Sequence, residues 1–274
     1  THLAYSLTCD FLIDYMDVSI IIVNYNTLKV TAACVNSVFE KTQGLDYEVI
    51  LVDNASTDGS KEHFARDKRV RYIYSERNGG FGYGNNRGME VARGKYFFLL
   101  NSDTLLKNNA VKLFFDYAES HAPRTVYGCY LEGPDGSYRG SFHYFPAFTI
   151  GQFLRRTIKG QDYTPTYKDT AVECVCGADM FLPRSAYDEC GGFDEHIFLY
   201  GEEGEWQYRM MLHGFRRMLI STPKIIHLEG ASDPNPSKKK AHWDSHFYVL
   251  RKYMHRPTYW LARVYYFVRC GARE

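Results

Sequence analysis

The aspartate at position 103 ends an apolar run and stands among small polar residues, in the stretch LLNSDTLLKN (residues 99–108). A carboxylate at the end of a buried strand is a ligand for hard cations, which take oxygen donors and hold diphosphates in proteins. Asn, Ser, Asp and Thr are also the preferred helix N-cap residues, and a helix is expected to begin near Lys107. The stretch alone therefore fits a metal site and an ordinary helix start equally well.

A second metal ligand is available in His227, which follows three residues, KII, in the stretch PKIIHLEG. Imidazole beside carboxylate and phosphate oxygens suits Mn²⁺, and Mg²⁺ is tolerated. A single histidine is more often structural than a ligand, so this site depends first on Asp103. Asp53 ends another apolar run. It could accept the imide N–H of uracil or thymine, or it could cap the helix expected near Thr57.

Three glutamates follow Gly201 in the stretch GEEGEWQYRM. Glu205 and Arg209 are four residues apart, so they are expected to pair on the surface of a helix. Glu202 and Glu203 lie at the expected helix start, where the helix dipole favours carboxylates. One of them, ionised, could take the proton from an attacking hydroxyl group. A cation for a diphosphate leaving group and a base for a hydroxyl acceptor together predict glycosyl transfer.

These residues need a scaffold, and the first half of the chain predicts alternating strands and helices. Apolar or β-branched runs occur at residues 18–23, 47–53, 70–75 and 95–101. Such alternation predicts a parallel sheet covered by helices on both faces, which binds ligands beyond the carboxyl ends of its strands. The residues at the four strand ends are Asn24-Tyr25-Asn26, Asp53-Asn54-Ala55-Ser56, Glu76-Arg77-Asn78-Gly79-Gly80 and Asn101-Ser102-Asp103, and most of them are polar. Each end carries two or more polar residues where a helix cap needs one, which favours a polar ligand site.

The alternation weakens after about residue 123. The later elements are predicted to be a hairpin (127–145), a mobile polar loop (155–170), a strand with a short helix (172–187), a helix (201–214) and two short strands within RMLI and KIIHLEG. Trp206, Met210 and Met211 are the expected core residues of the helix at 201–214. The second half is therefore expected to complete the sheet and to add its own polar groups.

The end of the chain is basic and aromatic, although the formal net charge of the whole chain is only +1. From Lys238 to Glu274 there are nine Lys or Arg and two acids. Basic residues mixed with aromatics on helices are typical of segments that lie in an anionic membrane interface. The alternative is a helix packed on the domain with its cations solvated. The apolar residues expected in the interface are Trp243, Phe247, Tyr248, Leu250, Trp260, Leu261, Tyr265, Tyr266, Phe267 and Val268.

Cysteine usage and hydropathy add a prediction about the compartment. The seven cysteines are an odd number without CxxC spacing, so they are expected to be reduced thiols of a cytoplasmic protein. We expect no signal peptide and no membrane-spanning segment. Nucleic acid is not an expected partner, because no binding motif accompanies the basic tail.

Several stretches resemble the family-2 inverting glycosyltransferases of GT-A fold, and most closely the rhamnosyltransferase-like branch that builds bacterial polysaccharides. They are VSIIIVNYNTLKVTAACVNSV, VILVDNASTDGS, NGGFGYGNNRGMEVARGKYFFLLNSDT and CGADMFLPRSAYDECGGFDEHIFLYGEEGEWQYRM. The resemblance implies an α/β fold with a mostly parallel, Rossmann-like sheet flanked by helices and followed by a helical tail. The implied parts are an extension (1–17), a GT-A domain (18–230, with a nucleotide-binding half at 18–123 and an acceptor half at 124–230) and the tail (231–274).

The resemblance also assigns nucleotide-binding residues. Asp53 matches the family aspartate that binds the nucleobase, and Asn24 and Asn26 lie beside it. The loop that lies near the nucleotide is matched by Asn78, Gly79 and Gly80.

Metal and base positions are matched as well. Asn101, Ser102 and Asp103 occupy the family's DXD position, where Asp103 matches the metal ligand and Asn101 replaces the first Asp. His227 matches a histidine that completes the metal site in relatives. Glu203 matches the catalytic base, but the family usually has the shorter Asp there, so Glu202 is the alternative.

The implied reaction transfers a sugar from dTDP-L-rhamnose or a UDP-sugar to a hydroxyl of a growing, lipid-linked glycan by single displacement, with Mn²⁺ or Mg²⁺. The enzyme is expected in the cytoplasm, peripherally bound at the inner face of the cell membrane. One rival is a non-catalytic sugar-nucleotide-binding module, suggested by the altered acids. The other is a dinucleotide-dependent oxidoreductase, suggested by GGFGYGNNRG (79–88). Its glycines follow the third strand, however, whereas a dinucleotide fingerprint follows the first.

Overall fold

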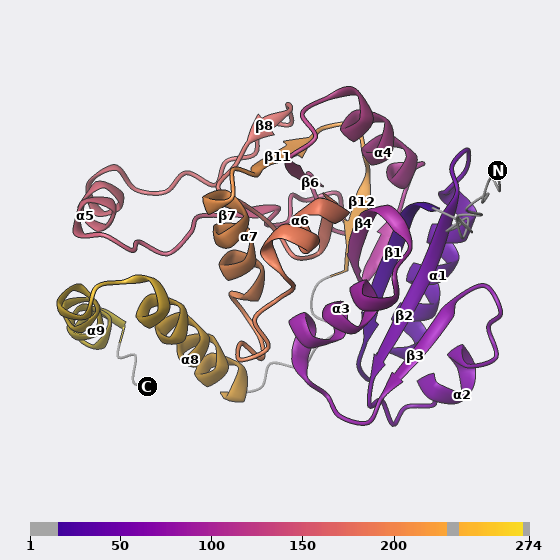
Figure 1. Ribbon diagram of the computed structural model, residues 1–274, viewed down its shortest axis with the longest axis horizontal. Coiled ribbons are helices and arrows are strands. Elements are labelled where there is room, and N and C mark those ends of the chain that lie inside the picture. The colour runs from indigo at the N-terminus through magenta and orange to yellow at the C-terminus, as the bar shows by residue number, and fades with distance from the viewer. Residues whose placement is uncertain (1–15, 229–235, 271–274) are drawn as a thin grey trace, which may run out of the picture.

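The computed structural model describes residues 16–228 and 236–270 of the chain, so most of the predicted extension at 1–17 lies outside the described residues. An eight-stranded sheet in the order β3-β2-β1-β4-β10-β6-β11-β8 runs through the molecule (Figure 1). Its strands are β1 (Met16–Asn24), β2 (Tyr47–Asn54), β3 (Arg71–Ser75), β4 (Gly94–Asn101), β6 (Thr125–Cys129), β8 (Thr170–Ala171), β10 (Asp179–Pro183) and β11 (Arg216–Ile220). Two strand pairs stand apart: β5 (Thr104–Leu106) with β12 (Ile225–His227), and β7 (Phe142–His143) with β9 (Cys174–Val175).

Helices cover the sheet and extend from one end of it. They are α1 (Leu28–Lys41), α2 (Ser60–Phe64), α3 (Gly80–Val91), α4 (Ala110–Ser120), α5 (Ile150–Lys159), α6 (Arg184–Cys190), α7 (Glu202–Leu212), α8 (Pro236–Tyr253) and α9 (Arg256–Cys270). Strand residues alternate between two cores, because successive side chains point to opposite faces. Ile20, Ile22 and Phe98 pack with α1 and α4, whereas Ile21 and Phe97 pack with α3, α6 and α7. Both faces are therefore buried, as the continuous apolar runs predict.

Strands β3, β2, β1 and β4 are parallel, which confirms the predicted architecture of the first half. Asn24 lies opposite Asp53, and Val23 lies opposite Asn101. The polar residues that end these strands therefore lie at one edge of the sheet. Strand β10 is antiparallel to both β4 and β6 and brings the second half of the chain into the same sheet.

The glycines of α3 allow this helix to lie against β1. A Cβ atom on Gly84 would be 2.6 Å from Val23 Cγ1, and one on Gly88 would be 2.4 Å from Ile21 Cγ2. Both distances are too short for a real side chain. Helix–sheet packing thus accounts for the glycine-rich stretch that suggested a dinucleotide fold.

The helix expected near Lys107 is α4, which begins three residues later at Ala110. The short strand β5 that precedes it and pairs with β12 was not predicted. A second local prediction was wrong in part. A mobile loop was expected at 155–170, but its first part lies in α5. The helix begins with a capping box, in which Thr149 and Gln152 bind each other's backbone, and this stabilises a helix start within a polar sequence.

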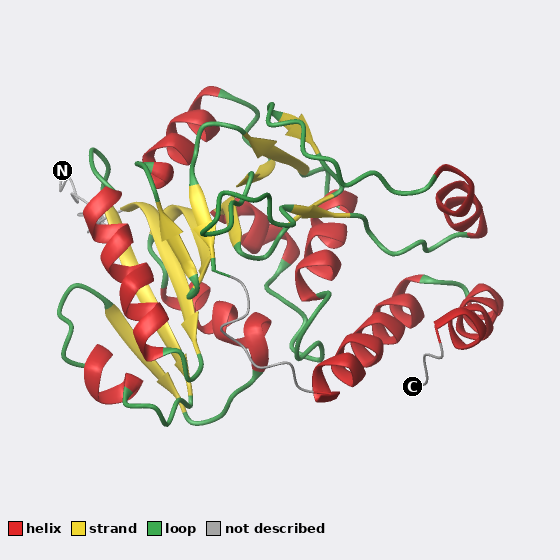
Figure 2. Ribbon diagram, turned by 180° about the vertical axis from the view of Figure 1, so that it is seen from behind, coloured by secondary structure: helices red, strands yellow, loops and turns green. Residues whose placement is uncertain are grey.

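The two tail helices differ in their burial. In α8, Phe247 and Leu250 are buried against the rest of the protein, and Lys252 Nζ lies 2.6 Å from an oxygen of Asp194. The packed alternative is therefore correct for these α8 residues. In α9, Trp260 and Val268 remain exposed, at the end of the molecule that also carries α5 (Figure 2). No described helix combines the length and apolar character needed to cross a bilayer.

Candidate active site

Asp103 and His227 come together although 124 positions separate them in the sequence. The pairing of β5 with β12 places His227 opposite Thr104, and His227 Nε2 lies 3.3 Å from Asp103 Oδ1. The Asp103 carbonyl also accepts the Leu228 amide at 2.9 Å, which fixes the two segments. The side chains are 21% and 11% exposed, so the pair is sheltered but open to a ligand. An oxygen and an imidazole nitrogen at this spacing fit the donor set that Mn²⁺ prefers.

The predicted nucleobase residues form a buried hydrogen-bond network. Asn24 Nδ2 donates to Ser56 Oγ at 3.0 Å, and the backbone N–H of Asn26 donates to the same oxygen at 2.9 Å. Asp53 accepts the Ser56 amide through Oδ1 and the Tyr72 hydroxyl through Oδ2, at 2.8 and 2.9 Å. The contact with Ser56 is a local turn and not the helix cap that the sequence left open for Asp53, because α2 begins at Ser60 with Gly59 as its N-cap residue. Each carboxylate oxygen of Asp53 retains a second lone pair.

Asn26 is exposed and adopts a left-handed backbone conformation, with φ of 54°. Its side-chain oxygen accepts the Thr57 amide at 2.7 Å. The network thus holds the turns after β1 and β2 against each other. Ser56 is its shared member. The sequence places Ser56 among the strand-end residues but does not single it out for a role, because a serine in a turn is common.

The loop at 78–80 is held from two sides. Asn78 Oδ1 accepts the Gly80 amide at 3.0 Å, and Asn54 Nδ2 donates to the Gly80 carbonyl at 2.9 Å. Gly80 has φ of +89°, and a Cβ there would lie 2.0 Å from the Phe198 carbonyl oxygen. Gly79 has no room for a side chain either, because Tyr83 lies against it. Glycine is therefore required at position 80 by its positive φ and by close backbone approach, and at position 79 by the Tyr83 side chain.

The three glutamates of α7 have separate environments. Glu205 is fully buried and pairs with Arg209 at 2.8 Å, so the predicted pair is confirmed, although it lies inside the protein. Glu202 is 3% exposed, and its Oε2 is buried without a hydrogen-bond partner. Burial raises the pKa of Glu202 well above its ordinary range, and the neighbouring Glu203 raises it further. Glu203 is partly exposed, so its carboxylate is accessible to an acceptor hydroxyl, whereas that of Glu202 is not.

One short segment connects the metal end of the site to α7. The backbone N–H of Asn101 donates to the Ala178 carbonyl oxygen at 3.0 Å. At the adjacent Gly177, a Cβ would lie 3.7 Å from Glu203 Cβ and 3.5 Å from the Phe81 ring. Residues 177–178 therefore pack between the end of β4 and the side chain of Glu203. Ser102 is also part of this edge, with its Oγ 3.5 Å from Thr27 Oγ1.

Asp179 is a buried acid that the sequence analysis did not select. It is fully buried, and its Oδ2 accepts the Cys129 amide at 2.7 Å, whereas Oδ1 has no partner. Burial raises the pKa of Asp179 to about 7, and the Cys129 hydrogen bond and nearby His227 oppose that shift. The signal in the sequence was a single acid within the apolar strand GADMFL.

We expect Asp179→Asn to remove a pH-dependent loss of stability. Between about pH 4 and pH 7 the folded protein keeps a proton on Asp179 that the unfolded chain releases, so stability falls as pH rises through this window. Asparagine still accepts the Cys129 amide but cannot ionise. Relative to wild type, the variant should gain about 1–4 kcal/mol between these pH values, measured by urea unfolding. A difference between the two proteins that does not change with pH would contradict this assignment.

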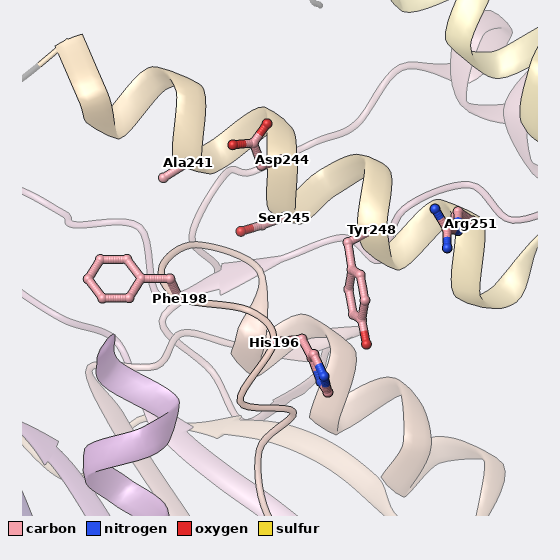
Figure 3. A pocket seen from close by; sticks show the side chains of 7 residues that line it. All are labelled: His196, Phe198, Ala241, Asp244, Ser245, Tyr248 and Arg251. Atoms are coloured by element: carbon pink, nitrogen blue, oxygen red, sulfur yellow. The ribbon is translucent and has the colours of Figure 1, made fainter. Parts of the chain in front are cut away.

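Two surface cavities lie outside the predicted nucleotide, metal and base residues. The first, about 450 Å³, has α8 as one wall, with Ser245 and Tyr248, and the segment before α7 as the other, with His196 and Phe198 (Figure 3). The second, about 650 Å³, lies between α1 and α2. The residues lining these two cavities include none of the predicted site residues. The candidate site is an open edge of the sheet, and these cavities do not define it.

The fold and the strand-end residues together define the class of GT-A glycosyltransferases. Residues 19–191 match the model of the family described as Glycosyl transferase family 2. The chain therefore belongs to glycosyl transferase family 2, which confirms the resemblance seen in its motifs.

Named relatives agree with the family. Over 231 residues the chain is 25% identical to N-acetylglucosaminyl-diphospho-decaprenol L-rhamnosyltransferase of Mycobacterium tuberculosis, covering 74% of each chain. Over 132 residues it is 30% identical to Glycosyltransferase GlyG of Streptococcus pneumoniae, covering 47% of this chain and 43% of that protein. The crystal structure of GalNAc-T7 with UDP, GalNAc and Mn²⁺ has the same fold, with a TM-score of 0.63 at 16% identity, covering 81% of this chain and 45% of that one. The match spans less than half the length of the last two proteins.

Proposed function

We propose that this protein is an inverting glycosyltransferase that moves a sugar from a nucleoside diphosphate to a hydroxyl of a glycan acceptor. The observation that carries the proposal is the Asp103–His227 pair at the carboxyl edge of the sheet. Segment 177–178 links that edge to Glu203. A cation site for a diphosphate and a carboxylate for a hydroxyl are the two groups that a single displacement needs.

The residues present fit a divalent cation. Within the described residues no group of three or more His, Cys, Asp or Glu side chains converges on one point. Asp103 and His227 would therefore hold Mn²⁺ or Mg²⁺ together with diphosphate oxygens and water, as is usual for cations bound to phosphates. When bound, the cation supplies charge that stabilises the departing diphosphate. Glu203 holds the acceptor proton at its carboxylate, and Asn24, Asn26, Asp53, and the loop at 78–80 form the nucleotide side of the site.

The donor and acceptor are proposed from the named relatives. The mycobacterial relative is named for L-rhamnosyl transfer to a decaprenol-linked sugar, and GalNAc-T7 was crystallised with UDP. We favour dTDP-L-rhamnose as the donor, with a UDP-sugar as the alternative, because Asp53 suits either pyrimidine. A lipid-linked glycan is the proposed acceptor. The proposed location is the cytoplasm, at the inner face of the membrane, where the basic tail would contact anionic lipid.

A thermal-shift screen of nucleotide sugars tests the proposal. With Mn²⁺ present, dTDP-L-rhamnose or one of the UDP-sugars should raise the melting temperature, because a ligand that binds the native state stabilises it. Purine-nucleotide sugars are the matched control and should have little effect. Binding without hydrolysis or transfer of the donor would instead indicate the non-catalytic sugar-nucleotide-binding module. The absence of any shift with pyrimidine donors would contradict both functions.

A further inference from the structure

Helices α5 and α9 are about 100 residues apart in the sequence, but they contact each other at one end of the molecule (Figures 1 and 2). The rings of Phe153 on α5 and Tyr265 on α9 meet edge to face, with centroids 4.6 Å apart. The two helices project from the end of the molecule opposite β3 and α2. Their outer faces are therefore candidates for one continuous surface.

Helix α5 presents an apolar stripe. Ile150, Leu154 and Ile158 are four residues apart and hence on one face, and they are 52%, 52% and 82% exposed. Arg155 and Lys159 each follow a stripe residue and are exposed. The helix is attached to the body through Arg156, whose guanidinium lies 2.7 Å from Glu173. The stripe is thus held in place by the fold, yet the described part of the chain does not cover it.

Helix α9 presents a second apolar stripe. Its exposed members, spaced as one helix face, are Trp260, Leu261, Val264, Phe267 and Val268. The opposite face carries Tyr259, which is 7% exposed and packs in the core that α8 shares. The helix is therefore oriented by the protein, with its apolar outer face turned away from that core.

The charges on both helices have one sign. Neither α5 nor α9 contains an Asp or Glu, and together they contain six Lys or Arg. An apolar face bordered by cations and rich in aromatic residues is the composition of helices that lie in a membrane interface. Each cation close to an anionic leaflet strengthens binding further.

We propose that α5 and α9 together form a docking surface for an anionic lipid membrane, hereafter the α5–α9 surface. The sequence predicts that the tail, which forms α8 and α9, contacts the membrane. Because α8 is packed on the domain, the proposed contact consists of α9 and α5 instead. The inference concerns binding to lipid and does not depend on catalysis. A second copy of the chain is the competing occupant, because the residues before the basic tail are acidic overall.

Flotation of the full chain with lipid vesicles tests the surface. At low salt, wild type should float with vesicles that contain phosphatidylglycerol, and less so at high salt or with phosphatidylcholine alone. The double variant Leu154→Glu/Ile158→Glu leaves α9 intact and should bind about tenfold or more weakly, because two apolar side chains no longer leave water. Leu212→Glu is the matched control. Leu212 is 62% exposed at the end of α7, outside the α5–α9 surface, and this variant should float as wild type does.

Three results would overturn the proposal. They are failure of wild type to float at low salt, undiminished flotation of the α5 double variant, and a concentration-dependent dimer that the double variant loses in analytical ultracentrifugation. The last result would assign the surface to a second copy. Unchanged melting temperature and nucleotide binding in the variants show that they are folded. Because flotation requires no donor or acceptor, its outcome is separate from that of the proposed sugar transfer.

Discussion

Replacing Asp103 with alanine is expected to abolish sugar transfer while the protein stays folded. Asp103 is the carboxylate of the Asp103–His227 pair and is 21% exposed, so its loss leaves no large cavity in the core. A cation bound to a departing diphosphate lowers the activation free energy by several kcal/mol. Without it, sugar transfer by the variant should be slower by about 10³-fold or more. Donor cleavage and product formation measure the rate, and the melting temperature reports folding.

Two controls separate this effect from general damage. Asp116→Ala removes an exposed acid from α4. The side chain of Asp116 forms an ion pair with Lys112, one turn away on the same helix, so this variant should leave activity unchanged. Wild type treated with excess EDTA should lose activity as Asp103→Ala does, and added Mn²⁺ should restore it. Full activity in excess EDTA would show that the site works without a divalent cation and would remove the metal from the proposal.

Glu203→Gln should lower turnover by about 10²–10⁴-fold, which is the usual contribution of a general base. Glutamine keeps the shape of the side chain but cannot accept the acceptor proton. The nucleotide affinity should change little, because Glu203 lies beside Gly177 rather than within the Asn24–Asp53 network. Single-turnover kinetics and nucleotide titration separate the two quantities.

Glu202→Gln is the matched control for this variant. Burial and the Glu203 charge raise the pKa of Glu202, so a neutral side chain there resembles the form that the protein already favours. Activity should therefore stay near the wild-type rate. An inactive Glu202→Gln beside an active Glu203→Gln would move the base by one residue. A product of retained anomeric configuration would exclude the single displacement altogether.

Local sequence patterns determined much of the first half of the protein. Runs such as VILV (residues 49–52) are apolar at every position, which requires a strand buried on both faces and hence helices on both sides. Parallel strands then place Asn24 beside Asp53 at a common edge without further information. The Glu205–Arg209 pair followed from helix spacing in the same way. These predictions were confirmed because each depends on the pattern within single strands and helices and on the parallel sheet that alternating strands and helices form.

Predictions near element ends failed where distant segments compete for the same residues. The residues after Asp103 have the composition of a helix start, but their backbone pairs with β12, more than 110 residues later. Asp179 was missed for a similar reason. Its burial follows from the position of β10 between β4 and β6, which no local pattern reveals.

The sequence by itself determined the class of fold, the strand-end polar residues and the basic, aromatic character of the tail. Only the tertiary structure decided that Asp103 meets His227, that Glu202 is buried while Glu203 is not, and that the tail divides into a packed α8 and an exposed α9. The physical reason is that periodicity states which residues can share a face, whereas burial of that face depends on what packs against it. In α8 the partners are Asp194 and Glu205, which bind Lys252 at 2.6 and 2.8 Å. In α9 no such partner buries Trp260 or Val268, which remain exposed in the described part of the chain.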